Sequence, residues 1–257
     1  MLKETLKESL LQLGLYYKIN GIRFRNDPRN SSQRAFYSTV ISKDDTVFDV
    51  GANVGQRTQL FAELARRVIA VEPQPLCLKH LRSRFRFNRN VIIENLALSD
   101  REGEATMCLS DSHTISSMSR KFINVMKEHT FRDSRWDKEI TVPTNTLDHL
   151  IEVYGVPKFV KIDVEGFEIN VLKGLTVPVP FISFEFTPEL MEEARACVER
   201  IREVSADYRF NYCLGEDLNF VLPEHADYST FMNVILPGMG AKGTFGDIYA
   251  IHEPGRV

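Results

Sequence analysis

The sequence lacks the features that identify secreted, membrane-spanning and zinc-binding proteins. It has only four cysteines in 257 residues, and no two of them form a Cys-x-x-Cys pair. The N-terminal leucines are interrupted by acids and bases, unlike the apolar stretch of a signal peptide, and no apolar run is long enough to cross a bilayer. These absences predict a soluble, cytoplasmic protein whose cysteines are reduced, buried thiols.

A large excess of one charge is also missing. The 32 basic and 35 acidic residues give a formal net charge of −3, which does not indicate a nucleic-acid binder. The most basic segment, residues 79–89, contains Leu81 and Phe85 at helical spacing. We interpret it as a helix whose basic side chains face solvent, so a nucleic-acid partner is not expected.

No repeat, low-complexity tract or linker divides the sequence, which favours one domain. Leucines recur on one helical face within residues 2–13 and predict a short amphipathic helix that packs on the domain or on a partner. Residues 20–35 are polar and are predicted to be a loop. We therefore assign residues 1–40 to an N-terminal helix and connecting loop, and residues 41–257 to the domain. The sequence makes no prediction of the oligomeric state.

Predicted strands and helices alternate along most of this domain. Such alternation predicts an α/β fold with a mainly parallel sheet, helices on both faces and a ligand at the carboxyl ends of the strands. The predicted strands are residues 46–50, 67–71, 91–95, 104–109, 138–142, 158–163, 181–186, 209–213 and 246–252. The predicted helices are residues 56–67, 76–88, 146–154, 167–174 and 188–205.

The loop after the first strand has the composition of a ligand-binding turn. It contains Asp49, Gly51, Asn53 and Gly55, and a predicted helix follows it. Glycine permits a tight turn and a close approach of the backbone to a ligand, while a helix N-terminus offers free N–H groups. The loop therefore suits either the pyrophosphate of a dinucleotide or the carboxylate of an amino acid.

Glu72 ends the second predicted strand, where a carboxylate can accept two hydrogen bonds from a ribose diol. The preceding loop has glycine only at Gly51 and Gly55, so it lacks the Gly-x-Gly-x-x-Gly pattern that a pyrophosphate prefers. This difference favours S-adenosylmethionine over NAD. Asp49 is then expected to lie near the cationic methionine end of the cofactor.

The segment after the third predicted strand is expected to pass the adenine. It contains Leu96 and Ala97, which could pack on the ring while backbone groups hydrogen-bond to its edge. Packing in the protein core explains these two side chains equally well, so both interpretations stay open.

Four segments of the sequence together resemble the FkbM-type methyltransferases, in the family's order and spacing, over about residues 45–190. They are Val47–Gly55, Val71–Pro73, Asn95–Asp100 and Val160–Glu168. The resemblance implies a class I, Rossmann-like methyltransferase fold whose seven-stranded, mainly parallel sheet has an antiparallel last strand. It also implies methyl transfer from S-adenosylmethionine, usually to a hydroxyl of a sugar, polyketide or other small metabolite. The acceptor itself does not carry over, because the family's substrates are diverse.

Three carboxylates follow or end adjacent predicted strands and are the candidate catalytic groups. Asp163, which we also assign to the cofactor site, Glu165 and Glu185 could take the proton of an acceptor hydroxyl. They could instead hold a divalent cation that orients a sugar diol, an alternative that we favour less. His113, in the polar segment 110–118, is a further candidate base near neutral pH.

The leading functional prediction is therefore an S-adenosylmethionine-dependent O-methyltransferase acting on a sugar, a glycan or another small metabolite. An RNA or protein methyltransferase is the alternative within the same chemistry. An NAD-dependent oxidoreductase is disfavoured by the glycine pattern. A non-catalytic nucleoside-binding module is disfavoured by Asp163 and Glu165.

Overall fold

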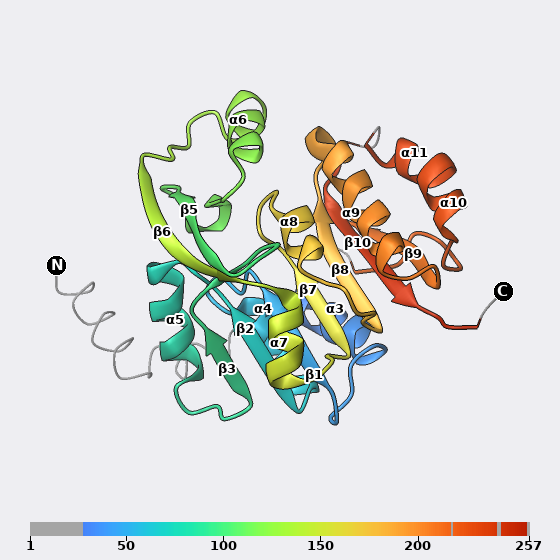
Figure 1. Cartoon of the computed structure of the whole chain (residues 1–257), viewed down its shortest axis with the longest axis horizontal. Coiled ribbons are helices and arrows are strands. Elements are labelled where there is room, and N and C mark those ends of the chain that lie inside the picture. Colours follow the sequence, from blue (N-terminus) through green and yellow to red (C-terminus); the bar gives the residue numbers. More distant parts are fainter. Residues whose placement is uncertain (1–27, 217, 241–242, 256–257) are drawn as a thin grey trace.

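The computed structural model describes residues 28–216, 218–240 and 243–255, and these contain a seven-stranded sheet in the order β3-β2-β1-β7-β8-β10-β9 (Figure 1). Strands β3, β2, β1, β7 and β8 run parallel, whereas β10 is antiparallel to both of its neighbours. The predicted sheet, with its antiparallel last strand, is confirmed. The strands are β1 (Thr46–Val50), β2 (Arg67–Val71), β3 (Val91–Glu94), β7 (Phe159–Ile162), β8 (Phe181–Phe186), β9 (Tyr208–Leu214) and β10 (Gly246–His252).

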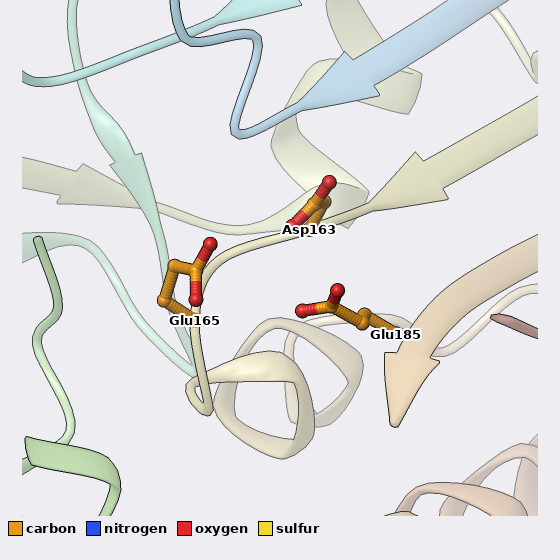
Figure 2. Close-up of side chains that lie close together, drawn as sticks. All are labelled: Asp163, Glu165 and Glu185. Carbon is orange, nitrogen blue, oxygen red and sulfur yellow. The ribbon is translucent and has the colours of Figure 1, made fainter. Parts of the chain in front are cut away.

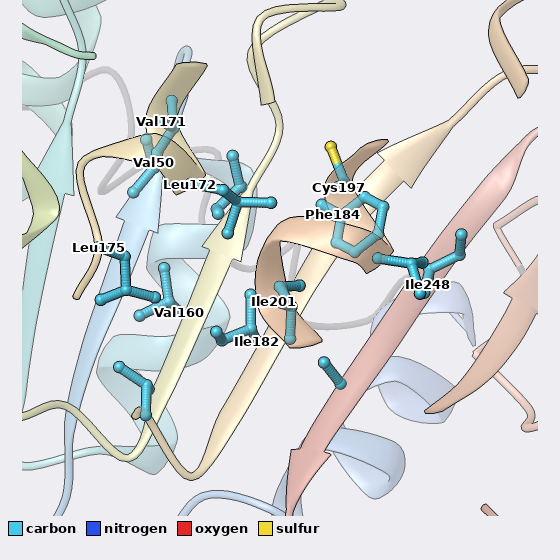
Figure 3. Packing of buried hydrophobic residues seen from close by; sticks show 14 of the residues in the cluster. Val50, Val160, Val171, Leu172, Leu175, Ile182, Phe184, Cys197, Ile201 and Ile248 are labelled. Carbon is cyan, nitrogen blue, oxygen red and sulfur yellow. The ribbon is translucent and has the colours of Figure 1, made fainter. Parts of the chain in front are cut away.

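Helices cover both faces of this sheet, so the central strands are apolar on both sides. Every residue of β1 and β7 is buried, and alternate side chains of β1 enter different cores. Phe48 packs in the larger core, part of which is shown in Figure 3, and Val47 packs in the smaller one. The longer helices are α3 (Pro28–Ser38), α4 (Gln56–Leu64), α5 (Pro75–Phe85), α6 (Arg120–Glu128), α7 (Leu147–Tyr154) and α9 (Met191–Val204). The shorter ones are α8 (Glu168–Lys173), α10 (Tyr228–Thr230), α11 (Leu236–Gly240), η1 (His113–Ile115), η2 (Pro188–Leu190) and η3 (Phe231–Ile235).

A small second sheet is inserted between β3 and α7. Its strands are β4 (Ala97–Leu98), β6 (Lys138–Asn145) and β5 (Gly103–Leu109), in that spatial order. The connection between β5 and β6 carries η1 and α6. Figure 1 shows this insertion, in green, beyond the carboxyl ends of β1 and β2. It therefore stands where a parallel sheet binds its ligand.

The predicted loop over residues 20–35 is wrong for its last part. Helix α3 begins at Pro28, and the first turn of a helix tolerates proline. Its end packs against the domain, because Tyr37 is fully buried and its ring meets that of Phe61 edge-on at 4.9 Å. Aromatic packing thus stabilises a helix that the polar composition concealed. The predicted N-terminal amphipathic helix lies outside the described residues, and the boundary at residue 40 stays a prediction.

Two predictions from what the sequence lacks can be compared with the structure. All four cysteines are buried and unpaired, as expected for small apolar side chains. Among the described residues, no helix combines the length and the apolar character needed to cross a bilayer.

Candidate functional site

A cavity of about 560 Å³ lies at the carboxyl ends of β1, β2 and β7, which is within the usual range for small-molecule sites. All of the predicted site residues except Gly55 line it. Gly55 lies beside α5 instead: a Cβ atom at this position would come within 2.6 Å of the Phe85 ring. Glycine at this position allows α5 to pack closely, and the cofactor role predicted for Gly55 stays a prediction. The lining residues from the predicted set are Asp49, Gly51, Asn53, Glu72, Leu96, Ala97, His113, Asp163, Glu165 and Glu185.

Gly51 joins the ends of three strands. Its φ of +82° lies in the left-handed region, and an added Cβ atom would stand 1.8 Å from the carbonyl oxygen of Asp163. Its N–H donates to the carbonyl of Val71 at 3.0 Å. Glycine is required here because β1, β2 and β7 meet closely, and the loop that follows is held at the edge of the cavity.

Glu72 is a buried carboxylate that is held by backbone groups. One oxygen accepts the N–H of Asn53 at 2.8 Å, and the other accepts the N–H of Gln74 at 2.7 Å. Each oxygen keeps further acceptor capacity, which suits a pair of neighbouring hydroxyls. Burial raises the pKa of Glu72 to about 7, although both N–H bonds oppose this shift.

Apolar side chains form another part of the cavity wall. Leu96 and Ala97 lie there with Met107 and Met118 of the inserted segment. Ala97 begins β4, which pairs with β6, so this wall is anchored to the small sheet. The arrangement offers an apolar surface of the kind that a flat aromatic ring packs against.

The three predicted carboxylates converge in the same cavity. Figure 2 shows Asp163 and Glu165 on the turn after β7 and Glu185 on β8. An oxygen from each lies within 4.8 Å of an oxygen from each of the others. Burial raises the pKa values of Glu165 and Glu185 well above the ordinary range, and the charge of Asp163 adds to both shifts. Such a cluster is suited to accept a proton or to bind a divalent cation.

The family model described as the FkbM domain of methyltransferases matches residues 49–212. The match covers more than half of the chain and includes Glu72 and all three carboxylates of the cluster. The chain belongs to the FkbM methyltransferase family.

Two comparisons with known proteins are informative. The hexuronic acid methyltransferase AglP of Haloferax volcanii is 29% identical over 150 residues, which are 55% of this chain and 54% of AglP. The crystal structure of an FkbM methyltransferase from Methylobacillus flagellatus KT superposes with a TM-score of 0.50 at 15% identity, covering 83% of this chain and 47% of that one. The chain thus spans about half the length of each. The structural likeness confirms the class I, Rossmann-like methyltransferase fold.

Lys161 lies beneath the carboxylates of this FkbM domain and was not among the predicted site residues. Its buried ammonium donates to Asp163 Oδ2 at 2.6 Å. Burial opposes its charge, but Asp163 and Asp247 outweigh this effect and raise the pKa of Lys161. The sequence did contain a signal, because a lysine inside a buried strand requires a counter-charge.

Glu168 fixes the turn that carries Glu165. Its Oε1 accepts the N–H groups of Val164 and Gly166, both at 3.1 Å. The side chain is buried, and burial raises the pKa of Glu168 to about 7. The two backbone N–H groups of the turn need an acceptor, and Glu168 provides it at a buried position where a charged carboxylate is unfavourable.

Glu168→Gln is expected to raise the free energy of unfolding at pH 8 by about 2–3 kcal/mol and to leave it nearly unchanged at pH 5. Glutamine keeps the accepting oxygen of both N–H bonds and has no charge to bury. The folded pKa of Glu168 is about 7 against an ordinary 4.5, so the folded state binds more protons in this window. The wild type must therefore lose stability as pH rises from 4.5 to 7.

Thermal or urea unfolding at both pH values measures the effect of Glu168→Gln, with the exposed Glu199→Gln as the matched control. A Glu168→Gln variant less stable than the wild type at pH 8 would show that the turn requires the ionised carboxylate.

His113 lies on the Glu72 side of the cavity. Its carbonyl oxygen accepts the side-chain N–H groups of Gln74 at 3.1 Å and Asn53 at 3.5 Å. Its Nδ1 is buried and, within the described part of the chain, has no hydrogen-bond partner. The same two residues that hold Glu72 thus also hold η1. The base role predicted for His113 stays a prediction. Gln74 has no sequence pattern around it that would have selected it.

Proposed function

We propose that this protein is an S-adenosylmethionine-dependent methyltransferase that methylates a hydroxyl of a sugar or glycan. The observation that carries the proposal is one cavity with a backbone-held carboxylate, Glu72, and a separate group of three carboxylates. Membership of the FkbM family supports the reaction, and the sugar-acid substrate named for the AglP relative supports the acceptor class.

The residues around the cavity fit the proposed cofactor, which supplies a methyl group activated by the sulfonium charge. Glu72 would accept hydrogen bonds from the two ribose hydroxyls, and Leu96 and Ala97 would pack against the adenine. Asp49 and the turn at Gly51 would face the methionine end. Asp49 is buried and accepts a hydrogen bond from Thr58 Oγ1 at 2.5 Å, so its carboxylate has a fixed position from which to attract a cation.

The three-carboxylate cluster would bind and deprotonate the acceptor. Hydroxyl groups donate well to carboxylate oxygens, and a base works best when its pKa lies near the working pH. The raised pKa values of Glu165 and Glu185 meet this condition better than those of exposed acids. We assign proton removal first to Asp163, because Lys161 holds its carboxylate in place at the end of β7. Glu165 and Glu185, with their raised pKa values, are supporting groups, and His113 is the alternative base.

The negative charge of the three-carboxylate cluster, where the acceptor would bind, favours a hydroxyl over a carboxylate as the methylated group. An acceptor carboxylate at contact distance would be repelled by Asp163, Glu165 and Glu185. A divalent cation in the cluster would remove this repulsion and would orient a diol. We favour the metal-free arrangement, and a chelator separates the two: activity lost in EDTA and restored by Mg²⁺ would establish the cation.

The experiment that tests the function combines binding and transfer. Calorimetry should detect S-adenosylhomocysteine and not NADH. Tritiated S-adenosylmethionine should then label a methyl glycoside of glucose, mannose or glucuronic acid, and the label should resist mild alkali, which releases methyl esters but not ethers. Preferred binding of NADH would overturn the proposal. Label found only in RNA or protein acceptors would overturn its acceptor class, and label released by alkali would overturn the hydroxyl.

A further inference from the structure

The turn that carries Glu165 is held in an uncommon backbone conformation. Glu165 has a φ of +55°, in the left-handed region that residues with a Cβ atom rarely adopt. Such a conformation costs on the order of 1 kcal/mol or more and persists only where surrounding contacts impose it. The following residue, Gly166, also has a positive φ, of +83°, and an added Cβ atom there would stand 2.6 Å from the Phe122 side chain. Packing therefore limits how this turn can be built.

Glu168 holds the N–H groups on both sides of Glu165, and the carbonyl of Glu165 itself is held from the inserted segment, 48 residues away in sequence. The hydroxyl of Ser117 donates to the carbonyl oxygen of Glu165 at 2.6 Å. The same hydroxyl accepts the N–H of Ser119 at 2.8 Å, so it is used as both donor and acceptor. Ser117 is fully buried, where an unpaired carbonyl or hydroxyl would be costly.

Ser117 is itself rigidly placed. Its N–H and C=O pair with the backbone of Cys108 at 3.0 and 2.9 Å, which fastens it to β5. A hydrogen bond from such a fixed donor can select one orientation of the Glu165 peptide. Since the Glu165 carboxylate reaches the cluster from this peptide, its distance to Asp163 and Glu185 depends on that orientation.

We propose that Ser117 is a positioning residue for the reaction: its hydroxyl holds the turn at Glu165 and thereby assembles the three-carboxylate cluster. The proposal rests on the proposed function for its catalytic consequence. Its geometric consequence can be tested without any acceptor. Through Ser117, the inserted segment thus helps to form the part of the cavity where the acceptor would bind.

The first test is structural. Crystal structures of the wild type and of Ser117→Ala are compared at the turn. In the wild type, the φ of Glu165 should be positive and the three carboxylates should have oxygens within 4.8 Å of one another. In Ser117→Ala, the turn should relax and the Glu165 carboxylate should leave the cluster. An unchanged turn in the variant would overturn the proposal. Ser117→Cys, which is close in size and a weak donor, provides the same comparison if the alanine variant does not fold.

The second test is kinetic and uses whichever of the three methyl glycosides the wild type methylates. Ser117→Ala should lower kcat at least about tenfold and change the Kd of S-adenosylhomocysteine less than about twofold, with Ser117→Cys between the two. Ser112→Ala, an exposed serine on the same segment, is the matched control and should behave as wild type. If Ser117→Ala loses donor affinity and melting temperature together with kcat, its role is purely structural and the proposal is overturned.

The pH profile adds a readout that a general loss of stability would not produce. Burial, then the charges of Asp163 and Glu165, raise the pKa of Glu185. If the ionisation of Glu185, as a supporting group, contributes to the acidic limb of the kcat profile, moving Glu165 away should shift that limb to lower pH in Ser117→Ala. An unshifted limb would contradict the displacement. If the wild type methylates none of the glycosides, the proposed acceptor is wrong, and the structural comparison still decides the role of Ser117.

Discussion

Asp163→Asn should lower kcat by about 10²–10⁴-fold while changing the affinity for S-adenosylhomocysteine by less than about threefold. Asparagine preserves the shape of the side chain but cannot take a proton from an acceptor hydroxyl, and losing a positioned base commonly costs this much. Asp163 lies at the junction of β1 and β7, where its N–H donates to the carbonyl of Val50 at 2.9 Å. The backbone contact remains in the variant, so the donor end of the cavity should keep its geometry.

The Asp163→Asn experiment needs a control for the buried lysine beneath the site. Asp163 Oδ2 is the hydrogen-bonding partner of Lys161, and removing one member of a buried ion pair destabilises a protein. The melting temperature of Asp163→Asn, measured beside turnover, separates the loss of this ion pair from the loss of the base, because Lys161 keeps Asp247 as a second counter-charge. The exposed Asp133→Asn serves as the neutral control. Wild-type turnover in a folded Asp163→Asn variant would remove this residue from the mechanism.

The sheet could be predicted because the sequences of its central strands are compatible with few other secondary structures. Runs such as β1 and β7 are short, apolar and followed by glycine or acidic turns, and their burial on both faces leaves no polar alternation to misread. The same logic placed the site, since the carboxyl ends of parallel strands meet at one edge. Asp49, Glu72 and Asp163 follow from this rule alone.

Helices whose stability comes from tertiary packing were not predictable in the same way. Helix α11 contains Pro237 and Gly238, both of which disfavour a helix in isolation, yet Leu236 and Met239 are buried in the larger core. Helix α6 lies in a stretch rich in serine, threonine and charge. Its buried Phe122, Ile123 and Met126 do fall on one helical face, but the polar composition around them obscured this short signal. In α11, by contrast, local propensity is overridden by apolar contacts that are distant in sequence.

The contacts that complete the site were hidden for a related reason. Gln74 binds η1 across 39 residues, and Ser117 binds the turn at Glu165 across 48. Neither serine nor glutamine has a spacing that reveals such a partner. Strand-end chemistry is thus visible in the sequence, whereas the inserted segment that joins the two ends of the cavity is visible only once the chain is folded.

Glu72→Ala should weaken the binding of S-adenosylhomocysteine by about 1–3 kcal/mol, or roughly 5- to 150-fold in Kd, because the ribose hydroxyls lose a charged acceptor. Calorimetry at pH 8 measures this loss, with the exposed Glu102→Ala as the control. Part of the effect is indirect: the N–H groups of Asn53 and Gln74 would also lose their acceptor. Glu72→Gln can satisfy one of these N–H groups but not both, so its affinity should lie between wild type and Glu72→Ala.

The pH dependence of binding tests whether the ionised form of Glu72 is the one that binds the ribose. Burial raises the pKa of Glu72 to about 7, so the free protein exchanges this proton near neutral pH. A carboxylate accepts hydrogen bonds from two hydroxyls better than a carboxylic acid does, so binding should release the proton and weaken as pH falls through 7. With a pKa of about 7, the Kd of the wild type should rise about tenfold between pH 8 and pH 6. Glu72→Gln has no proton to release there, and its Kd should stay flat. An unchanged affinity in folded Glu72→Ala would mean that the ribose is bound elsewhere. A wild-type Kd that is equally flat would mean that Glu72 does not exchange its proton in this pH range.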